Sequence, residues 1–107
     1  MTLDMATIRA SLLQPYVGEL FQMVHSPDLA IPVQLKRCSE FPEGKMQGTP
    51  RTPFSLEFEA EDETVPPFQW GDFSFFHPDV PAIGPVHVSR ILNPTAPTRA
   101  LFQVVFG

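Results

Sequence analysis

Residues 51–60 have the sequence RTPFSLEFEA, in which apolar and polar side chains alternate from Phe54 onward. Successive side chains of a β-strand point to opposite faces, so a period of two predicts a strand with one buried face and one solvent-facing face. The predicted core positions are Phe54, Leu56, Phe58 and Ala60, and the predicted outward positions are Ser55, Glu57 and Glu59.

Comparable alternation recurs along the chain, and segments rich in proline, glycine, asparagine and aspartate separate the alternating stretches. The chain has thirteen prolines among its 107 residues, which disfavours long helices. We therefore predict a single domain over residues 1–107, all-β and mainly antiparallel: a small, partly open barrel or sandwich of five to six strands, with a meander favoured. The other predicted strands are residues 17–24, 31–38, 72–77, 85–92 and the C-terminal stretch from Leu101.

Helical spacing is convincing only near the N-terminus. Met5, Ile8 and Leu12 recur at intervals of three to four residues, and Pro15 follows. This pattern predicts one short helix over residues 4–14, lying against an open end of the β core, because so short a helix is unstable alone.

Two connections are expected from composition. Residues 39–52 are rich in glycine, proline, lysine and glutamate and predict a long loop. Residues 64–71, which contain Pro66, Pro67 and Gly71, predict a second connection. Pro32 predicts that its strand begins at a sheet edge, where an added strand from a partner could pair.

Charge and cysteine content exclude several classes of function. The formal net charge is −5, and lysine and arginine cluster only at Lys36–Arg37, so binding to nucleic acid or to an anionic membrane is not expected. Cys38 is the only cysteine, so an intrachain disulfide is excluded. The N-terminal residues lack the pattern of a signal peptide, which predicts cytoplasmic synthesis, with later incorporation into a larger particle still open.

The histidines carry the alternative hypothesis of a pocket. His77 and His87 would converge if their strands paired, which would favour a small-molecule-binding barrel or a small enzyme. The sequence contains no metal-binding motif of known ligand spacing. For His77 we prefer the interpretation that it ends a strand and forms a hydrogen bond with the backbone. No metal or other cofactor is therefore predicted, and a small-molecule ligand is not expected, because small barrels fill with their own side chains.

The sequence contains no phosphate-binding glycine loop, nucleophile elbow or paired-carboxylate motif, which favours a non-enzymatic domain. Two surfaces are candidates for a protein partner or for self-association. One is an aromatic patch formed by Phe68, Trp70 and Phe76, unless the N-terminal helix covers it. The other is the outward side of the 54–60 strand, at Ser55, Glu57 and Glu59.

Four short motifs follow one another in a specific order. They are VGELF at residues 17–21, RTPFSLEF at residues 51–58, FSFFHP at residues 73–78 and FQVVF at residues 102–106. In this order the chain resembles a small uncharacterised bacterial domain family of about 100 residues, a family of unknown function with the signature R-x-P-F-S-L-x-F. It differs from the family pattern in its proline-rich connections at 64–67 and 93–97, and in Gln103 and Gly107.

Members of that family tend to be encoded near tail-collar-like or tail-fibre-like proteins. The resemblance implies a structural or accessory role in a phage-tail-like or surface assembly, and it carries no catalytic residues. Together with the absent catalytic motifs, it predicts a non-enzymatic domain that acts through contact with other proteins.

Overall fold

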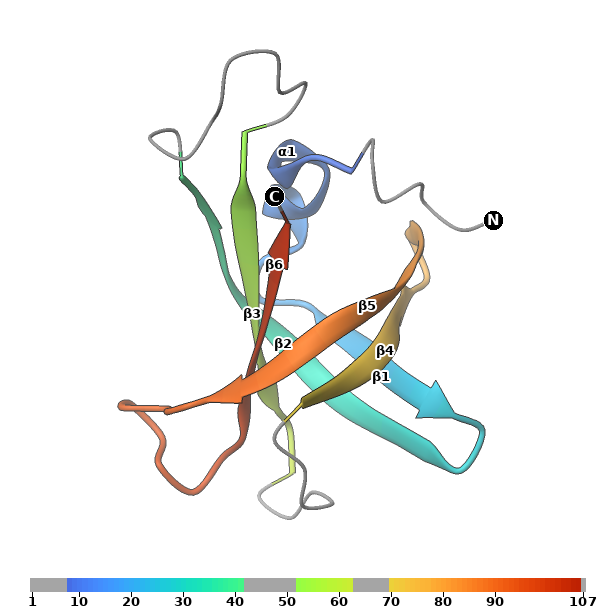
Figure 1. Cartoon of the computed structure of the whole chain (residues 1–107), viewed down its shortest axis with the longest axis vertical. Helices are drawn as coiled ribbons and strands as arrows, with labels where there is room; N and C mark the ends of the chain where they lie inside the picture. The colour runs from blue at the N-terminus through green and yellow to red at the C-terminus, as the bar shows by residue number, and fades with distance from the viewer. Residues whose placement is uncertain (1–7, 42–51, 63–69, 107) are drawn as a thin grey trace.

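Six antiparallel strands close into one barrel in the computed structural model, which describes residues 8–41, 52–62 and 70–106 (Figure 1). The predicted all-β barrel with a short N-terminal helix is confirmed. In chain order the elements are α1 (Ala10–Leu13), the 3₁₀-helix η1 (Gln14–Tyr16), β1 (Leu20–Ser26), β2 (Leu29–Glu40), β3 (Phe54–Ala60), β4 (Trp70–His77), β5 (Val80–Ile91) and β6 (Leu101–Phe106).

The strands follow the order β1-β2-β3-β6-β5-β4 around the barrel. Two three-stranded meanders, β1-β2-β3 and β4-β5-β6, are joined where β3 pairs with β6 and β1 pairs with β4. The expected meander is therefore correct only within each half. Aromatic packing accompanies the β3–β6 junction, where the rings of Phe54 and Phe106 stack with centroids 4.7 Å apart. The barrel is closed rather than partly open, since each described strand pairs with a neighbour on both sides over at least part of its length.

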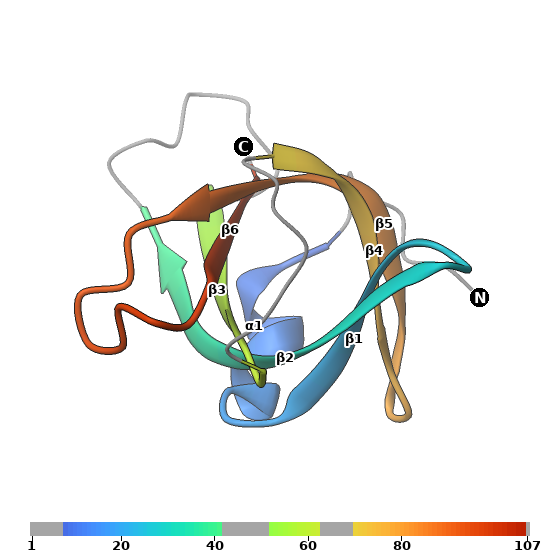
Figure 2. The ribbon, with the colours of Figure 1, turned by 90° about the horizontal axis from the view of Figure 1, so that it is seen from below.

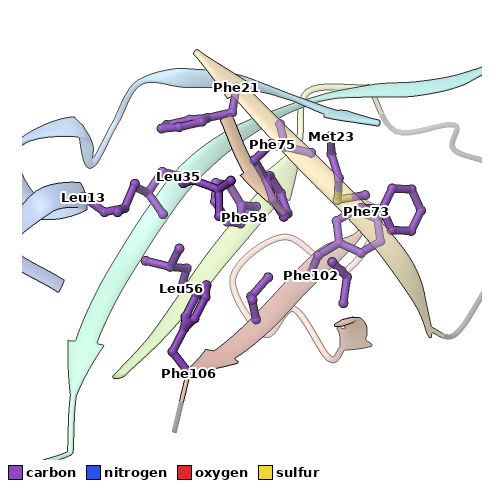
Figure 3. Close-up of a cluster of buried hydrophobic side chains, with 14 of the residues drawn as sticks. Leu13, Phe21, Met23, Leu35, Leu56, Phe58, Phe73, Phe75, Phe102 and Phe106 are labelled. Carbon is purple, nitrogen blue, oxygen red and sulfur yellow. The ribbon is translucent and has the colours of Figure 1, made fainter. Parts of the chain in front are cut away.

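The interior is filled by the inward side chains of all six strands (Figure 3). The predicted core face of β3 is confirmed, since its four apolar side chains are buried. Phe58 stacks on Phe75 with ring centroids 4.3 Å apart, and Phe21 meets Phe58 edge-on at 5.5 Å. These contacts tie β1, β3 and β4 together across the barrel.

The N-terminal segment covers one end of this core. Viewed along the barrel, α1 lies across the opening of the ring of strands (Figure 2). Ile8 and Leu13 are buried, and the thiol of Cys38 in β2 lies 3.6 Å from the carbonyl oxygen of Ala10. The expected position is confirmed, but the predicted span of 4–14 is too long in its described part. Ile8 and Arg9 are extended or irregular rather than helical, and residues 1–7 lie outside the described chain.

Several predicted boundaries move. β5 begins at Val80 rather than at residue 85, because it continues through Pro81 and Pro85. β2 extends to Glu40, so the predicted 39–52 loop begins later, and its residues 42–51 lie outside the described chain. β4 already begins at Trp70, within the predicted connection. Pro32 is not at a sheet edge: it lies in β2 between β1 and β3, where pairing with β3 has just ended at Val33. A residue without an N–H group is tolerated there because no ladder bond is lost.

The β4–β5 hairpin contains a bulge at Gly84. Phe73 pairs with Val86 and Phe75 with Ile83, so Gly84 and Pro85 together stand opposite the single residue Ser74. Gly84 has a φ of +123°, a conformation that side chains disfavour. A Cβ atom there would lie 2.8 Å from the carbonyl oxygen of Phe73 and 2.8 Å from the Cα of Ser74. The bulge therefore requires glycine on both conformational and steric grounds.

We predict that Gly84→Ala lowers the free energy of unfolding by about 3 kcal/mol, since backbone strain and a clash with β4 act together. Gly18→Ala is the matched control. Gly18 also has a positive φ, +97°, but nothing lies within 4 Å of its added Cβ. The control should lose only about 1 kcal/mol, from backbone strain alone. Urea denaturation measures both, and equal losses would contradict the steric part of the argument.

Candidate functional site

One region of the outer barrel surface carries no charged side chain. It lies where β1 is flanked by β2 and β4, and its residues point outward because their neighbours in sequence point into the core. Leu20 and Phe76 are its large exposed apolar side chains, at 53% and 45% of full exposure. We call this region the uncharged face, and its residues are Leu20, Gln22, Val24, Ala30, Pro32, Gln34, Ser74 and Phe76.

Gln22 lies at the centre of the uncharged face. In the strand register it is directly opposite Phe76 of β4 on one side and Pro32 of β2 on the other. Leu20 and Val24 follow on the same side of β1, two positions away in each direction. An exposed amide is thus surrounded by four apolar side chains, which is the arrangement of a polar group within an apolar contact patch.

Trp70 belongs to a different part of the surface. Its indole is 69% exposed at the start of β4, opposite Ser89, and its ring lies 6.2 Å from that of His87. Phe76 lies six positions after Trp70 along β4, or about 20 Å away at the usual rise per residue. The predicted aromatic patch is therefore divided in two, and Phe68 lies outside the described chain. The alternative that the N-terminal helix covers these rings is wrong for Trp70 and Phe76, which are exposed.

The second predicted surface is only partly accessible. Ser55 was expected to face solvent, but it is 2% exposed and so offers no contact surface. Strand alternation fixes the direction of its side chain, not whether other parts of the chain cover it. Glu57 and Glu59 are partly exposed and line a groove of about 410 Å³, together with Lys36 and Arg37 of β2. The guanidinium of Arg37 lies 3.9 Å from the Glu57 carboxylate, so charges of both signs share this groove.

The other wall of the groove is the connection between β5 and β6, which is held by Asn93. The Asn93 amide donates to the Glu59 carboxylate at 2.9 Å and to the carbonyl oxygen of Arg99 at 3.2 Å. Its side-chain oxygen accepts hydrogen bonds from the Thr95 hydroxyl and the Ala96 amide, both at 3.2 Å. Glu59 is thus engaged within the protein, and the groove has no strong preference for either sign of charge.

His77 has a structural environment. Its side chain is 5% exposed, with its ring packed against Phe21 at 4.8 Å and edge-on to Tyr16 at 5.0 Å. Nδ1 accepts the backbone N–H of Asp79 at 3.0 Å, so Nε2 carries the proton and donates to the Glu19 carboxylate at 2.7 Å. The expectation that His77 ends a strand and bonds the backbone is confirmed. The ring joins the start of β1 to the β4–β5 hairpin.

The two histidines of the alternative pocket do not meet. β4 and β5 do pair, but His77 is opposite Val80 at the hairpin end, whereas His87 is opposite Asp72 near the start of β4. His77 points inward and His87 lies exposed on the outer surface, 3.8 Å from the Asp72 carboxylate. Within the described ranges, no group of three or more histidine, cysteine, aspartate or glutamate side chains is arranged to hold a metal ion.

Cys38 has the properties of a packing residue. Burial, reinforced by the negative charge of Glu40, raises the pKa of the Cys38 thiol above its ordinary value. A thiol that stays protonated at neutral pH is a poor nucleophile. Cys38 therefore serves the packing between β2 and the N-terminal segment.

The sequence matches the profile of one protein family. The profile of a family described as a domain of unknown function, DUF6916, matches residues 8–106. The chain belongs to the DUF6916 family. The match confirms the resemblance to a small uncharacterised family and spans every strand of the barrel. Comparisons with curated proteins and with solved structures found no significant match. Among the described residues of this DUF6916 domain, no helix has the length and hydrophobicity needed to cross a bilayer.

Sequence reasoning placed Phe76 at a surface but missed Leu20 and Gln22, the other main parts of the uncharged face. One signal was present: the outward positions of residues 20–24 and 30–34 contain no charged residue. Their convergence with Phe76 depends on the pairing of β1 with β4, which local patterns do not specify.

We predict that His77→Ala lowers the free energy of unfolding of this DUF6916 domain by about 3 kcal/mol, since a buried ring and its hydrogen bonds are lost. His87→Ala is the control, because its ring is exposed, and its effect should stay within about 0.5 kcal/mol. Urea denaturation followed by circular dichroism compares them. Equal effects would show that His77 does not join β1 to the hairpin.

Proposed function

We propose that this DUF6916 domain is a non-enzymatic protein-interaction domain whose contact surface is the uncharged face. The observation that carries the proposal is the position of Phe76 and Leu20, two large exposed apolar side chains grouped around Gln22 without a charge among them. Contact patches typically lack charge at their centre and contain exposed apolar or aromatic residues. By contrast, the outer surface of β3 carries Glu57 and Glu59, as expected for a strand that faces water.

The barrel interior supports a non-enzymatic role. Its space is taken by stacked phenylalanine rings such as Phe58 and Phe75, and a barrel of this size has little room for a ligand. His77 is engaged by Glu19 and by the Asp79 amide, and Glu59 is engaged by Asn93. Polar groups held in this way serve the fold and do not form an arrangement suited to acid–base chemistry.

The second part of the proposal concerns the larger assembly to which the domain belongs. We propose that the domain is made in the cytoplasm and serves as a structural or accessory component of a phage-tail-like or surface particle. The support for this part is the sequence resemblance and its implied gene context. A small, rigid barrel with one uncharged face is suited to packing against a neighbouring subunit.

The proposal predicts a protein neighbour at Phe76. A photo-crosslinking phenylalanine analogue placed at position 76 keeps an aromatic ring there and should form one dominant covalent adduct in the source cells. The same analogue at Trp70 is the matched control, since Trp70 is also an exposed aromatic on the outer side of β4. Mass spectrometry then identifies the adduct.

A charge substitution at position 76 should weaken binding of the protein identified by crosslinking. With purified components, Phe76→Glu should weaken binding roughly tenfold or more, because a charge is buried in an apolar contact. Trp70→Glu should leave binding unchanged. An absence of any adduct at position 76, or equal adducts at positions 70 and 76, would overturn the proposed function.

A further inference from the structure

We propose that the groove over β3 binds a free α-amino acid with a large apolar side chain, and that it recognises the carboxylate, the ammonium group and the side chain together. This groove is separate from the uncharged face, and its ligand does not depend on the protein contact proposed there. The order in which cations, carboxylates and apolar side chains line the groove is the observation that leads to this ligand.

Three chemically different strips cross the groove in the order of the strands. β2, β3, β6 and β5 are successive neighbours in the barrel. Lys36 and Arg37 line the β2 side, and Glu57 and Glu59 of β3 come next. Beyond them lie the apolar side chains of Leu101, Ile91 and Leu92. A ligand that crosses the groove therefore meets positive charge, then negative charge, then apolar surface.

A bulge in β2 places the two cations side by side. The pairing with β3 passes from Leu35 directly to Arg37, which leaves Lys36 as an extra residue. Leu35 is buried, whereas Lys36 and Arg37 are both exposed. Regular alternation would put only one of two consecutive side chains on the outer face. Bulges re-aim side chains in this way and are over-represented next to active sites.

The charged groups keep hydrogen-bonding capacity for a ligand. The Arg37 guanidinium and the Glu57 carboxylate are 3.9 Å apart, which is longer than the roughly 2.7–2.9 Å of a charge-assisted hydrogen bond. The Lys36 ammonium lies 3.5 Å from the side-chain oxygen of Gln34, a neutral group. A ligand carboxylate can therefore bind Lys36 and Arg37, and a ligand ammonium can bind Glu57.

The apolar wall is held in place before a ligand binds. Figure 2 shows the connection between β5 and β6 standing out from the ring of strands. Asn93 is 8% exposed, and its amide joins this connection to Glu59 at 2.9 Å. Leu92, the residue before it, is 91% exposed. A wall fixed in this way loses little conformational freedom when an apolar side chain packs against Leu92.

Charge complementarity favours a zwitterion over an anion or a cation. A simple anion would meet Glu57 and Glu59 beside the two cations, on a chain whose net charge is −5. A simple cation would meet Lys36 and Arg37. An α-amino acid carries a carboxylate and an ammonium group on one carbon and is neutral overall, so each group can face its opposite charge. Its side chain leaves the same carbon and can lie on the apolar strip.

The dimensions of the groove suit a small ligand. Its volume is about 410 Å³, within the range of small-molecule sites. It lies outside the barrel wall, so the phenylalanine-filled interior does not exclude a ligand there. Since Lys36 and Arg37 remain exposed to water, their contacts are modest, and we expect a dissociation constant of roughly 0.1 to 1 mM.

Ligands that each lack one group test this recognition. L-Phenylalanine, titrated into the full chain, should shift the backbone amide signals of Glu57, Glu59 and Leu92 in NMR spectra. Phenylpropanoate lacks the ammonium group and phenethylamine lacks the carboxylate, so each should bind roughly tenfold more weakly. L-Alanine keeps both charges but lacks the apolar area, and it should also bind at least roughly tenfold more weakly.

Substitutions that remove one charge assign each contact. Glu57→Gln should weaken phenylalanine binding roughly tenfold and leave phenylpropanoate binding nearly unchanged, because that probe has no ammonium group to lose. Lys36→Gln should weaken phenylalanine binding roughly fivefold and leave phenethylamine binding nearly unchanged. Asp72→Asn and Arg90→Gln remove the same charges outside the described lining of the groove and should bind like the wild type. Thermal unfolding monitored by circular dichroism establishes that each variant is folded.

Three results would overturn the proposed amino-acid site. One is the absence of signal shifts at the groove when phenylalanine exceeds the expected dissociation constant tenfold. Another is binding that stays unchanged in both Glu57→Gln and Lys36→Gln. The third is equal binding of phenylalanine and of either probe that lacks a charge. None of these results bears on crosslinking at Phe76, so the proposed function would stand if the groove bound no amino acid.

Discussion

Closure of a six-stranded barrel is the constraint on which the rest of this structure depends. Eight strands give an interior just wide enough for side chains to fill, and six enclose less. The stacked rings of Phe58 and Phe75, with Phe21 against them, occupy that space and hold strands from both halves of the chain. An interior filled in this way leaves the outer surface as the part of the barrel that can contact other molecules.

Closure also determines which side chains lie next to one another on the outer surface. Each described strand has a paired neighbour on both sides over at least part of its length, although β5 pairs with β6 only at Ser89, Arg90 and Ile91. The hydrogen bond between His77 and Glu19 joins the β4–β5 hairpin to the residue that precedes β1. β1 and β4 then pair in the register that puts Phe76 opposite Gln22. The proposed contact depends on side chains, and the strand register decides which of them lie together.

Local patterns predicted much of the fold and little of the site, for a physical reason. Alternation at Phe54, Leu56 and Phe58 reports which way each side chain points, and it was correct. It does not report whether an outward residue is covered, so Ser55 was misjudged. Neither does it report pairing between distant strands. The alternative hypothesis required His77 and His87 to converge, and they lie apart. Trp70 and Phe76 were grouped in one patch, although most of β4 separates them.

The absence of charge at the uncharged face is not explained by the needs of the fold. Leu20, Gln22 and Phe76 are exposed, so a polar or charged residue at these positions would cost the barrel little. The outer side of β3 demonstrates this, because Glu57 and Glu59 occupy equivalent outward positions beside a complete core. Exposed apolar side chains also carry a risk of aggregation in water. A face that combines this risk with no gain in stability supports the proposed contact with another protein.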